Sequence, residues 1–291
     1  MIDQWNGPTA KIQIYRVGPR GITMDGDLVT TEEPLEIRIN YYNGVVLEWE
    51  RVGITMRTPG SDYELTAGFL FTEGIIRDQH AIQRISHCLE RDVEQRYNIV
   101  NLYLKPGETI DLKLLTRNFY TTSSCGVCGK ASLESLEIKD YSALSYSDGQ
   151  VSSDVVRSLS TSMRKRQGLF RRTGGLHAAG LFELDGSLIC LREDVGRHNA
   201  VDKVIGQGLL SKSLPFDQKI LAVSGRTSFE IMQKALTAGV PMVVGVGAPS
   251  SLAVELAKKF HITLIGFANS DGFNIYCGEQ RIIGVDREEL G

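Results

Sequence analysis

The spacing of the apolar residues changes near the middle of this chain, and that change limits the folds it can adopt. Up to about residue 115, apolar and polar side chains mostly alternate, which is typical of half-buried antiparallel strands. The clearest alternating runs lie at 11–17, 34–39, 45–49 and 52–57. From about residue 150, short apolar runs alternate with segments of helical spacing, at 152–167, 195–207, 228–238 and 251–260. The sequence therefore predicts an α+β protein, with a smaller β-rich N-terminal domain at 1–115 and an α/β domain at 132–291 whose helices cover both faces of its sheet.

Composition and charge exclude several classes of protein. The 291 residues are 42% hydrophobic and 23% charged, which is ordinary for a soluble globular protein and excludes a disordered or collagen-like chain. A net charge of −3 gives no general attraction to nucleic acid or to an acidic membrane. The most apolar stretch, 240–248, is far shorter than the roughly 20 residues of a membrane-spanning helix, and the start of the chain shows no secretory signal. We therefore expect a cytoplasmic protein without a nucleic-acid or membrane partner.

Two of the five cysteines, Cys125 and Cys128, form a C-x-x-C pair in a polar, glycine-containing stretch between the two halves. We expect this stretch, 116–131, to be an exposed loop. The odd and sparse cysteine count argues against a disulfide framework. A zinc site needs four ligands, and neither the other cysteines nor the histidines supply a second spaced pair. A purely structural role conflicts with the preference of free cysteines for burial.

Thiol chemistry is the third interpretation of the C-x-x-C pair. The thiolate is the reactive form of cysteine, and loop amides, Lys130 and the helix start near Ser132 would stabilise it. A thioredoxin-type pair opens a helix soon after a strand, whereas this pair lies in the middle of a long loop. We therefore favour a thiolate on an arm that passes a group between partners over repeated disulfide exchange.

Glycine-containing turns follow several predicted strands of the second half. They lie at 173–177, 193–199, 224–228 and 245–250. Ligands of open α/β sheets bind at the carboxyl ends of the strands, where helix N-termini attract phosphate. Each turn also has an ordinary explanation: Asp194 suits a helix N-cap, His198 can border an apolar helix face, and 245–250 is an imperfect copy of G-x-G-x-x-G. Together, and with Arg226 as a phosphate ligand, the turns favour a nucleotide or another phosphorylated ligand.

Five short motifs stand out in the chain: CGVCG at 125–129, GGLH at 174–177, EDVGRHNAVDK at 193–203, SGRTSFE at 224–230 and FNIY at 273–276. They closely resemble the FdhD/NarQ family, whose members are accessory sulfurtransferases for formate dehydrogenase. The matches run in order through the second half, whereas the first half shows only a compatible layout. The resemblance implies a homodimeric sulfur carrier that takes sulfane sulfur from a cysteine desulfurase and passes it to the molybdenum bis-guanine-dinucleotide cofactor. It implies that Cys125 carries the persulfide and that Cys128 is a second thiol that assists or resolves it.

The resemblance also implies a second domain similar to cytidine deaminases, but without their metal. Zinc deaminases need H-x-E followed by P-C-x-x-C. Here His177 is followed by two alanines, and Ser124 rather than proline precedes the C-x-x-C pair, which itself lies upstream. We therefore expect no metal ligands and no tightly bound zinc. A zinc-dependent hydrolase remains the least favoured alternative, behind a non-catalytic chaperone that binds the cofactor and formate dehydrogenase.

The cofactor-binding segment of the family falls just before the FNIY motif. It corresponds here to Phe267, Ala268, Asn269, Ser270, Asp271 and Gly272. Many members resemble F-A-R-G at its start, so that Asn269 and Ser270 replace an arginine and a glycine. Gly225 and Arg226 are further candidates for cofactor binding. The charge lost at position 269 would then come from Arg226, Arg197 or His177.

Overall fold

The computed structural model describes residues 7–88, 96–111 and 149–284. The expected loop at 116–131, with Cys125 and Cys128, lies outside the described residues, and so do the expected domain boundaries at 115 and 132. Among the helices that are described, none is long and apolar enough to cross a membrane.

A four-stranded sheet with the order β4-β3-β6-β5 forms the N-terminal half, as the alternating runs predict. Its strands are β3 (Glu33–Asn43), β4 (Val46–Arg57), β5 (Ile82–His87) and β6 (Ile99–Leu104). Short 3-10 helices at Gln79–Ala81 and Arg96–Asn98 precede β5 and β6. β3 and β4 form an antiparallel hairpin, whereas β3 and β6 run parallel. Leu35, Ile37 and Ile39 alternate along β3 and pack in one core with helix α1 (Asp62–Thr72), which covers that face of the sheet.

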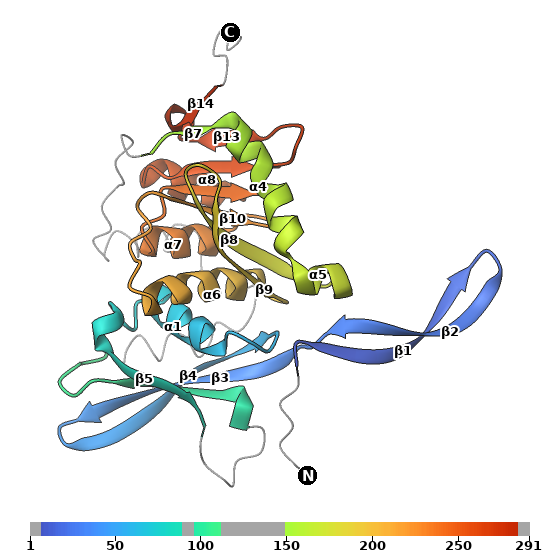
Figure 1. The fold of residues 1–291 in the computed structure, drawn as a ribbon. Coiled ribbons are helices and arrows are strands. Elements are labelled where there is room, and N and C mark those ends of the chain that lie inside the picture. The colour runs from blue at the N-terminus through green and yellow to red at the C-terminus, as the bar shows by residue number, and fades with distance from the viewer. Residues whose placement is uncertain (1–6, 89–95, 112–148, 285–291) are drawn as a thin grey trace.

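The first two strands form a separate ribbon that projects from the body of the molecule (Figure 1). β1 (Thr9–Gly18) and β2 (Gly21–Thr30) pair only with each other, in antiparallel register. A strand at 11–17 is therefore confirmed, but its expected half-burial is wrong. The alternation of apolar and polar residues gives the ribbon an apolar face, and no sheet or helix of the described chain covers the outer part of that face.

The second half contains a six-stranded mixed sheet with the order β13-β12-β11-β10-β8-β9. Its strands are β8 (His177–Glu183), β9 (Leu188–Asp194), β10 (Lys219–Val223), β11 (Met242–Gly245), β12 (Thr263–Gly266) and β13 (Asn274–Cys277). β10, β11 and β12 are parallel, while the outer strands join them antiparallel. A small parallel pair, β7 (Val151–Ser152) and β14 (Ile282–Ile283), lies beside it, and a 3-10 helix at Glu279–Arg281 precedes β14.

Helices cover both faces of this sheet, as the change of apolar spacing predicts (Figure 1). The helices are α4 (Ser153–Arg166), α5 (Gly168–Thr173), α6 (Arg197–Leu210), α7 (Phe229–Thr237) and α8 (Ser251–Lys259). One core joins α6, α7 and α8 to side chains such as Leu221 and Val243. A second core joins α4 to the alternate side chains of the same strands, such as Ala222 and Val244. Because successive side chains of a strand point to opposite faces, the two cores lie on opposite sides of the sheet.

Helices α1 and α6 join the two halves, since each covers one sheet and the two pack against each other. Buried polar groups add specific contacts across this joint. The Lys203 ammonium lies 2.7 Å from the Asp194 carboxylate and donates to the backbone oxygen of Thr58, which follows β4. The Lys234 ammonium, on α7, donates to the hydroxyl oxygen of Thr72 at the end of α1, at 2.9 Å, and also pairs with Asp202 on α6. The resulting layers are the four-stranded sheet, α1, the α6–α8 group, the six-stranded sheet and α4.

Candidate functional site

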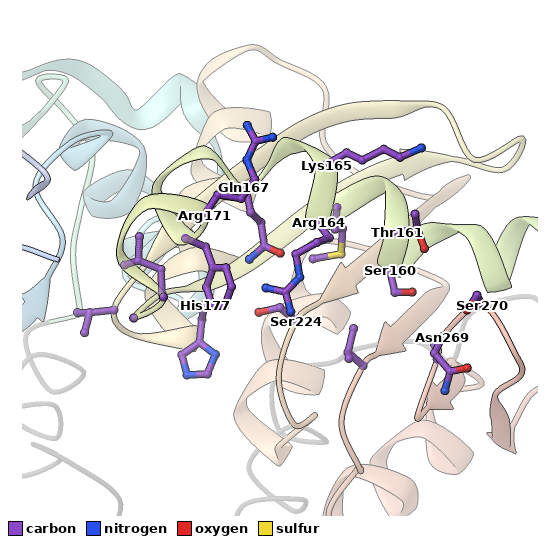
Figure 2. A pocket seen from close by; sticks show the side chains of 18 residues that line it. Ser160, Thr161, Arg164, Lys165, Gln167, Arg171, His177, Ser224, Asn269 and Ser270 are labelled. Atoms are coloured by element: carbon purple, nitrogen blue, oxygen red, sulfur yellow. The ribbon is translucent and has the colours of Figure 1, made fainter. Parts of the chain in front are cut away.

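A cavity of about 800 Å³ lies between the end of α4, helix α5 and the loops that follow β10, β11 and β12 (Figure 2). Three cationic side chains line it, those of Arg164, Lys165 and Arg171, and no aspartate or glutamate is among its lining residues. The cavity lies at the carboxyl ends of the parallel strands, where ligands of open α/β sheets bind. A space of this size with this charge suits a nucleotide-sized anion.

The wall formed by α4 and α5 is held in place by Glu193. The Glu193 carboxylate accepts hydrogen bonds from the backbone N–H groups of Leu169, at 3.0 Å, and Phe170, at 2.7 Å. A carboxylate at the first turn of a helix satisfies N–H groups that have no partner within the helix. The Phe170 ring in turn lies under Arg164, whose guanidinium carbon is 4.2 Å from the ring centroid. Glu193 of the EDVG motif thus supports a side chain of the cavity without lining it.

The opposite wall is made of loops that are hydrogen-bonded to one another. The N–H of Gly247 donates to the oxygen of Gly225 at 3.1 Å, and the N–H of Phe267 donates to the oxygen of Gly247 at 3.2 Å. A Cβ on Gly247 would lie 3.1 Å from the backbone of Gly225. The glycines of 245–250 therefore allow the loops to approach closely, and the N–H of Gly247 is already used between loops rather than left for phosphate.

The predicted cofactor segment at 267–272 forms a tight turn after β12. Its residues Ala268, Asn269 and Ser270 line the cavity. The Asn269 side chain donates to the oxygen of Phe267 and accepts from the N–H groups of Asp271, at 2.8 Å, and Gly272, at 3.2 Å. The amide group of Asn269 therefore makes hydrogen bonds within the turn. An arginine at this position would not make the same bonds. The segment is at the cavity, but the asparagine does not replace the guanidinium of the related motif.

Gly225 and Arg226 follow β10 beside the cavity, and the structure places only their neighbour Ser224 in its lining. A Cβ on Gly225 would lie 3.3 Å from Nδ1 of His177, so glycine leaves room for that ring. Of the three residues expected to supply charge, Arg226, Arg197 and His177, only His177 lines the cavity. Burial, followed by the charges of Arg197 and His198, lowers the pKa of His177 below its usual value.

The sequence interpretation missed the cations of α4 and α5. The sequence does contain a signal for a basic site here. Five arginines and lysines lie between 164 and 172, and no acidic residue lies between 155 and 182. The helical spacing of 152–167 predicts only the apolar face of α4, which packs on the sheet. Only the fold shows that the polar end of α4 faces the turn at 268–270.

Gln167, between α4 and α5, is also exceptional. It is 3% exposed, yet its Nε2 has no hydrogen-bond partner among the described residues. A buried donor without a partner costs about 1–3 kcal/mol. Figure 2 shows the Gln167 amide and the Arg164 guanidinium turned toward Ser224, with Lys165 pointing away from them. Among the described residues, the cavity thus combines cationic side chains that have no carboxylate partner with a donor that has no acceptor.

A second polar cluster lies at the start of α7, where it suggests a hydrolytic triad that its geometry does not support. Nε2 of His198 is 3.1 Å from Oγ of Ser228 and 3.0 Å from Oε2 of Glu230. A serine–histidine–acid triad needs the serine and the acid on different ring nitrogens. Here both contact the same nitrogen, and the hydrogen bond from His198 lowers the pKa of Glu230 to about 2. The cluster is a hydrogen-bonded group at a helix start, where Ser228 also accepts from the N–H of Ile231.

The three described cysteines are not reactive-site candidates. Cys88 is buried, and the partly buried Cys190 and Cys277 pack against the core that contains α6. Burial raises the pKa of the Cys190 thiol, which disfavours its thiolate. Within 7–88, 96–111 and 149–284, no three His, Cys, Asp or Glu residues are grouped to hold a metal ion. The predicted roles of Cys125 and Cys128 stay predictions, since both lie outside the described residues.

Comparison with known proteins agrees with the motifs. A model of the FdhD/NarQ family matches residues 30–283. A protein of Streptomyces coelicolor named sulfur carrier protein FdhD is 43% identical over 277 residues, which is 94% of this chain and 95% of that protein. The chain belongs to the FdhD/NarQ family. An FdhD protein of Sulfolobus acidocaldarius is 42% identical over 272 residues, 94% of this chain and 98% of the relative.

A solved structure supports the fold. The crystal structure of a putative formate dehydrogenase accessory protein from Desulfotalea psychrophila aligns with a TM-score of 0.71 at 24% identity. The alignment covers 94% of this chain and 99% of the other. The mixed α/β fold is therefore confirmed, while the likeness of the second domain to cytidine deaminases stays a prediction.

Proposed function

We propose that this FdhD/NarQ family chain is a sulfur carrier that activates a formate dehydrogenase. Cys125 takes sulfane sulfur from a cysteine desulfurase, and the chain passes it to a molybdenum bis-guanine-dinucleotide cofactor bound in the cavity beside α4 and α5. The observation that carries the proposal is a nucleotide-sized cavity with three cationic side chains and no carboxylate, bordered by the predicted cofactor segment at 268–270. The relatives named sulfur carrier protein FdhD support it.

The thiol steps need only the two cysteines of the C-x-x-C pair and an external thiol. The Cys125 thiolate attacks the outer sulfur of the desulfurase persulfide, whose own cysteine leaves as a thiolate, so that no net oxidation occurs. Release of that sulfur as hydrosulfide requires two electrons. Cys128 supplies them by attacking Cys125, which forms a disulfide between the two cysteines. A thiol reductant of the cytoplasm then restores both thiols.

The cavity fits the charged part of the proposed substrate. A guanine dinucleotide carries a diphosphate, and arginine binds such groups through paired, charge-assisted hydrogen bonds. The 800 Å³ of the cavity suits one nucleotide end of the cofactor. His177 is kept from gaining charge by its lowered pKa, so at neutral pH the positive charge comes from α4 and α5.

The test of sulfur transfer is mass spectrometry after incubation with a cysteine desulfurase and cysteine. We expect one added sulfur on the peptide that contains Cys125, none in Cys125→Ser, and retention of the adduct in Cys128→Ser. Peptides with Cys88, Cys190 and Cys277 serve as internal controls, because these thiols pack in or against the core. Addition of sulfur to those peptides in place of Cys125 contradicts the proposal.

A non-catalytic chaperone is the second candidate, because the cavity would bind a cofactor without help from the cysteines. Activation of formate dehydrogenase separates the two functions. Full activation by a Cys125→Ala protein supports the chaperone, whereas loss of activation with cofactor binding retained supports the carrier.

We also propose that the protein is a homodimer, joined through the β1–β2 ribbon. Tyr15, Val17, Ile22 and Met24 form cross-strand pairs on one face of the ribbon and are between 59% and 76% exposed. The turn between β3 and β4 is also apolar and exposed, and it lies at the opposite end of the molecule (Figure 1). A twofold axis would place each ribbon on the β3–β4 turn of the second copy, in two equivalent contacts.

The charges at the two ends of this contact are opposite. Near the tip of the ribbon, Arg16 pairs with Asp25 at 3.1 Å, which leaves Arg20 as the basic group for a partner, whereas 39–50 contains two glutamates and no lysine or arginine. A second copy therefore supplies the complement to both surfaces, apolar to apolar and basic to acidic.

A further inference from the structure

The cavity has two features that the proposed binding of a cofactor does not by itself explain. They are the buried donor of Gln167 without a partner and the Arg164 guanidinium without a carboxylate partner among the described residues. The two residues are three positions apart at the end of α4, a separation that places side chains on the same side of a helix. Both side chains extend toward Ser224 (Figure 2).

Neither feature is explained by folding. A buried donor is normally paired, and an unpaired one often marks a position where a ligand supplies the acceptor. Arg164 is fixed by its contact with Phe170, which Glu193 anchors through the first turn of α5. A guanidinium that is already positioned loses less side-chain freedom when it binds an anion.

The opposite wall lacks a comparable ligand. The Asn269 side chain uses its oxygen and one of its two N–H donors within its own turn, and Ser270 donates to Asp271. The Ser224 oxygen already accepts the N–H of Ala178, which leaves its hydroxyl proton to donate. The binding of charge must therefore come mainly from the side of α4.

We infer that Arg164 and Gln167 form a diphosphate clamp, in which the guanidinium and the amide nitrogen bind oxygens of a nucleoside diphosphate group. This inference rests on the proposed function, because the diphosphate is that of the dinucleotide cofactor. The clamp takes over the role of the arginine that Asn269 replaces. It recognises the diphosphate and not the base, so inorganic pyrophosphate is also a ligand.

Calorimetric titration of the full-length protein with GDP, and separately with pyrophosphate, tests the clamp. We expect wild type to bind both and Arg164→Ala to bind both at least about tenfold more weakly, the usual effect of losing a charged hydrogen bond. Arg172→Ala is the matched control, since Arg172 lies on α5 outside the cavity lining and should change either affinity by less than about twofold. Equal effects of the two arginine variants, or no binding by wild type, would overturn the inference.

Gln167→Leu gives a second and independent readout. Leucine removes the unpaired donor but keeps a similar volume, so we expect weaker binding of both ligands together with a Tm of the free protein that is higher by about 2–4 °C. A merely structural glutamine would show the reverse, a lower Tm with unchanged affinity. Persulfide formation on Cys125, measured on the same proteins, should not change. If wild type forms no persulfide on Cys125, the proposed carrier function is refuted and the clamp is not. If the GDP affinity is unchanged in both Arg164→Ala and Gln167→Leu, the clamp is refuted and the carrier function is not.

Discussion

Gly68 of α1 and Gly206 of α6 lie opposite each other where the two halves of the molecule meet. A Cβ on Gly68 would lie 1.9 Å from the oxygen of Asp202, and one on Gly206 would lie 1.8 Å from the oxygen of Glu64. No real Cβ approaches an oxygen so closely. The two helices are therefore in backbone contact, and the position of the N-terminal sheet relative to the α/β half depends on two residues without side chains.

Gly206→Ala should destabilise the protein by roughly 3 kcal/mol or more, because the added methyl group forces α1 and α6 apart and opens the cores on both sides. Urea unfolding checks this prediction. Gly168→Ala is the matched helical control, since a Cβ there meets nothing within 4 Å. The prediction fails if the two variants unfold at similar urea concentrations.

Removing one partner of the buried pair Asp202 and Lys234 should destabilise the protein, because the other partner is then left as a buried charge without compensation. Burial raises the pKa of Asp202, and Thr72 and Lys234 are its hydrogen-bond and ion-pair partners. Lys234→Met should therefore cost about 3–5 kcal/mol at pH 7, by leaving an uncompensated buried carboxylate.

This loss should depend on pH in a defined direction. Without the lysine, the folded form needs a protonated Asp202, so the stability of Lys234→Met falls as pH rises above the carboxyl's unfolded value of 3.8. Denaturant unfolding at pH 4.5 and at pH 7 measures the difference. The double variant Asp202→Leu with Lys234→Met should recover most of the stability, and a double variant no better than the single one would contradict the explanation.

His177 should make folding less favourable in mild acid. Its pKa is lowered in the folded protein, chiefly by burial, so the unfolded chain takes up a proton first as pH falls below 6.5. The contribution of a neutral His177 is thus present above pH 6.5 and is lost as pH falls toward its lowered folded value. An NMR titration should give a His177 midpoint below 6.5, and His177→Asn should reduce the loss of stability between pH 7.5 and 5.5. A midpoint at or above 6.5 would be inconsistent with this environment.

A charged substitution on the apolar face of the ribbon should break the proposed dimer contact, whereas one on the opposite face should not. Ile22→Asp places a charge on the apolar face and should give a monomer by analytical ultracentrifugation. Thr23→Asp, on the opposite face and paired with Arg16, should leave the dimer intact. Arg20→Glu and Glu50→Arg should each weaken the dimer, and their combination should restore it. A monomeric wild-type protein, or equal effects of the Ile22 and Thr23 variants, rules out this interface.

The elements themselves follow closely from local patterns. Alternation along β3 and β4 and the helical spacing of α4, α7 and α8 depend on neighbours in the sequence, and these elements lie where the patterns predict them. The same patterns misjudged β1, because alternation reveals an apolar face but not whether a core exists to cover it. They also could not show that Gly245 and Gly247 serve contacts between loops, since those contacts join three different strand ends.

The sequence by itself determined the element types, the change of pattern near the middle of the chain, the family motifs and which residues, 267–272, are the predicted cofactor segment, because each depends on residues close together along the chain. The tertiary structure alone decided which charges meet that segment. Arg164 and Gln167 precede Asn269 by more than one hundred residues, and they line one cavity with it only because α4 packs across the sheet. Salt screens the attraction between exposed charges beyond about 10 Å, so the partner of a charge is fixed by distance in space rather than by distance in sequence.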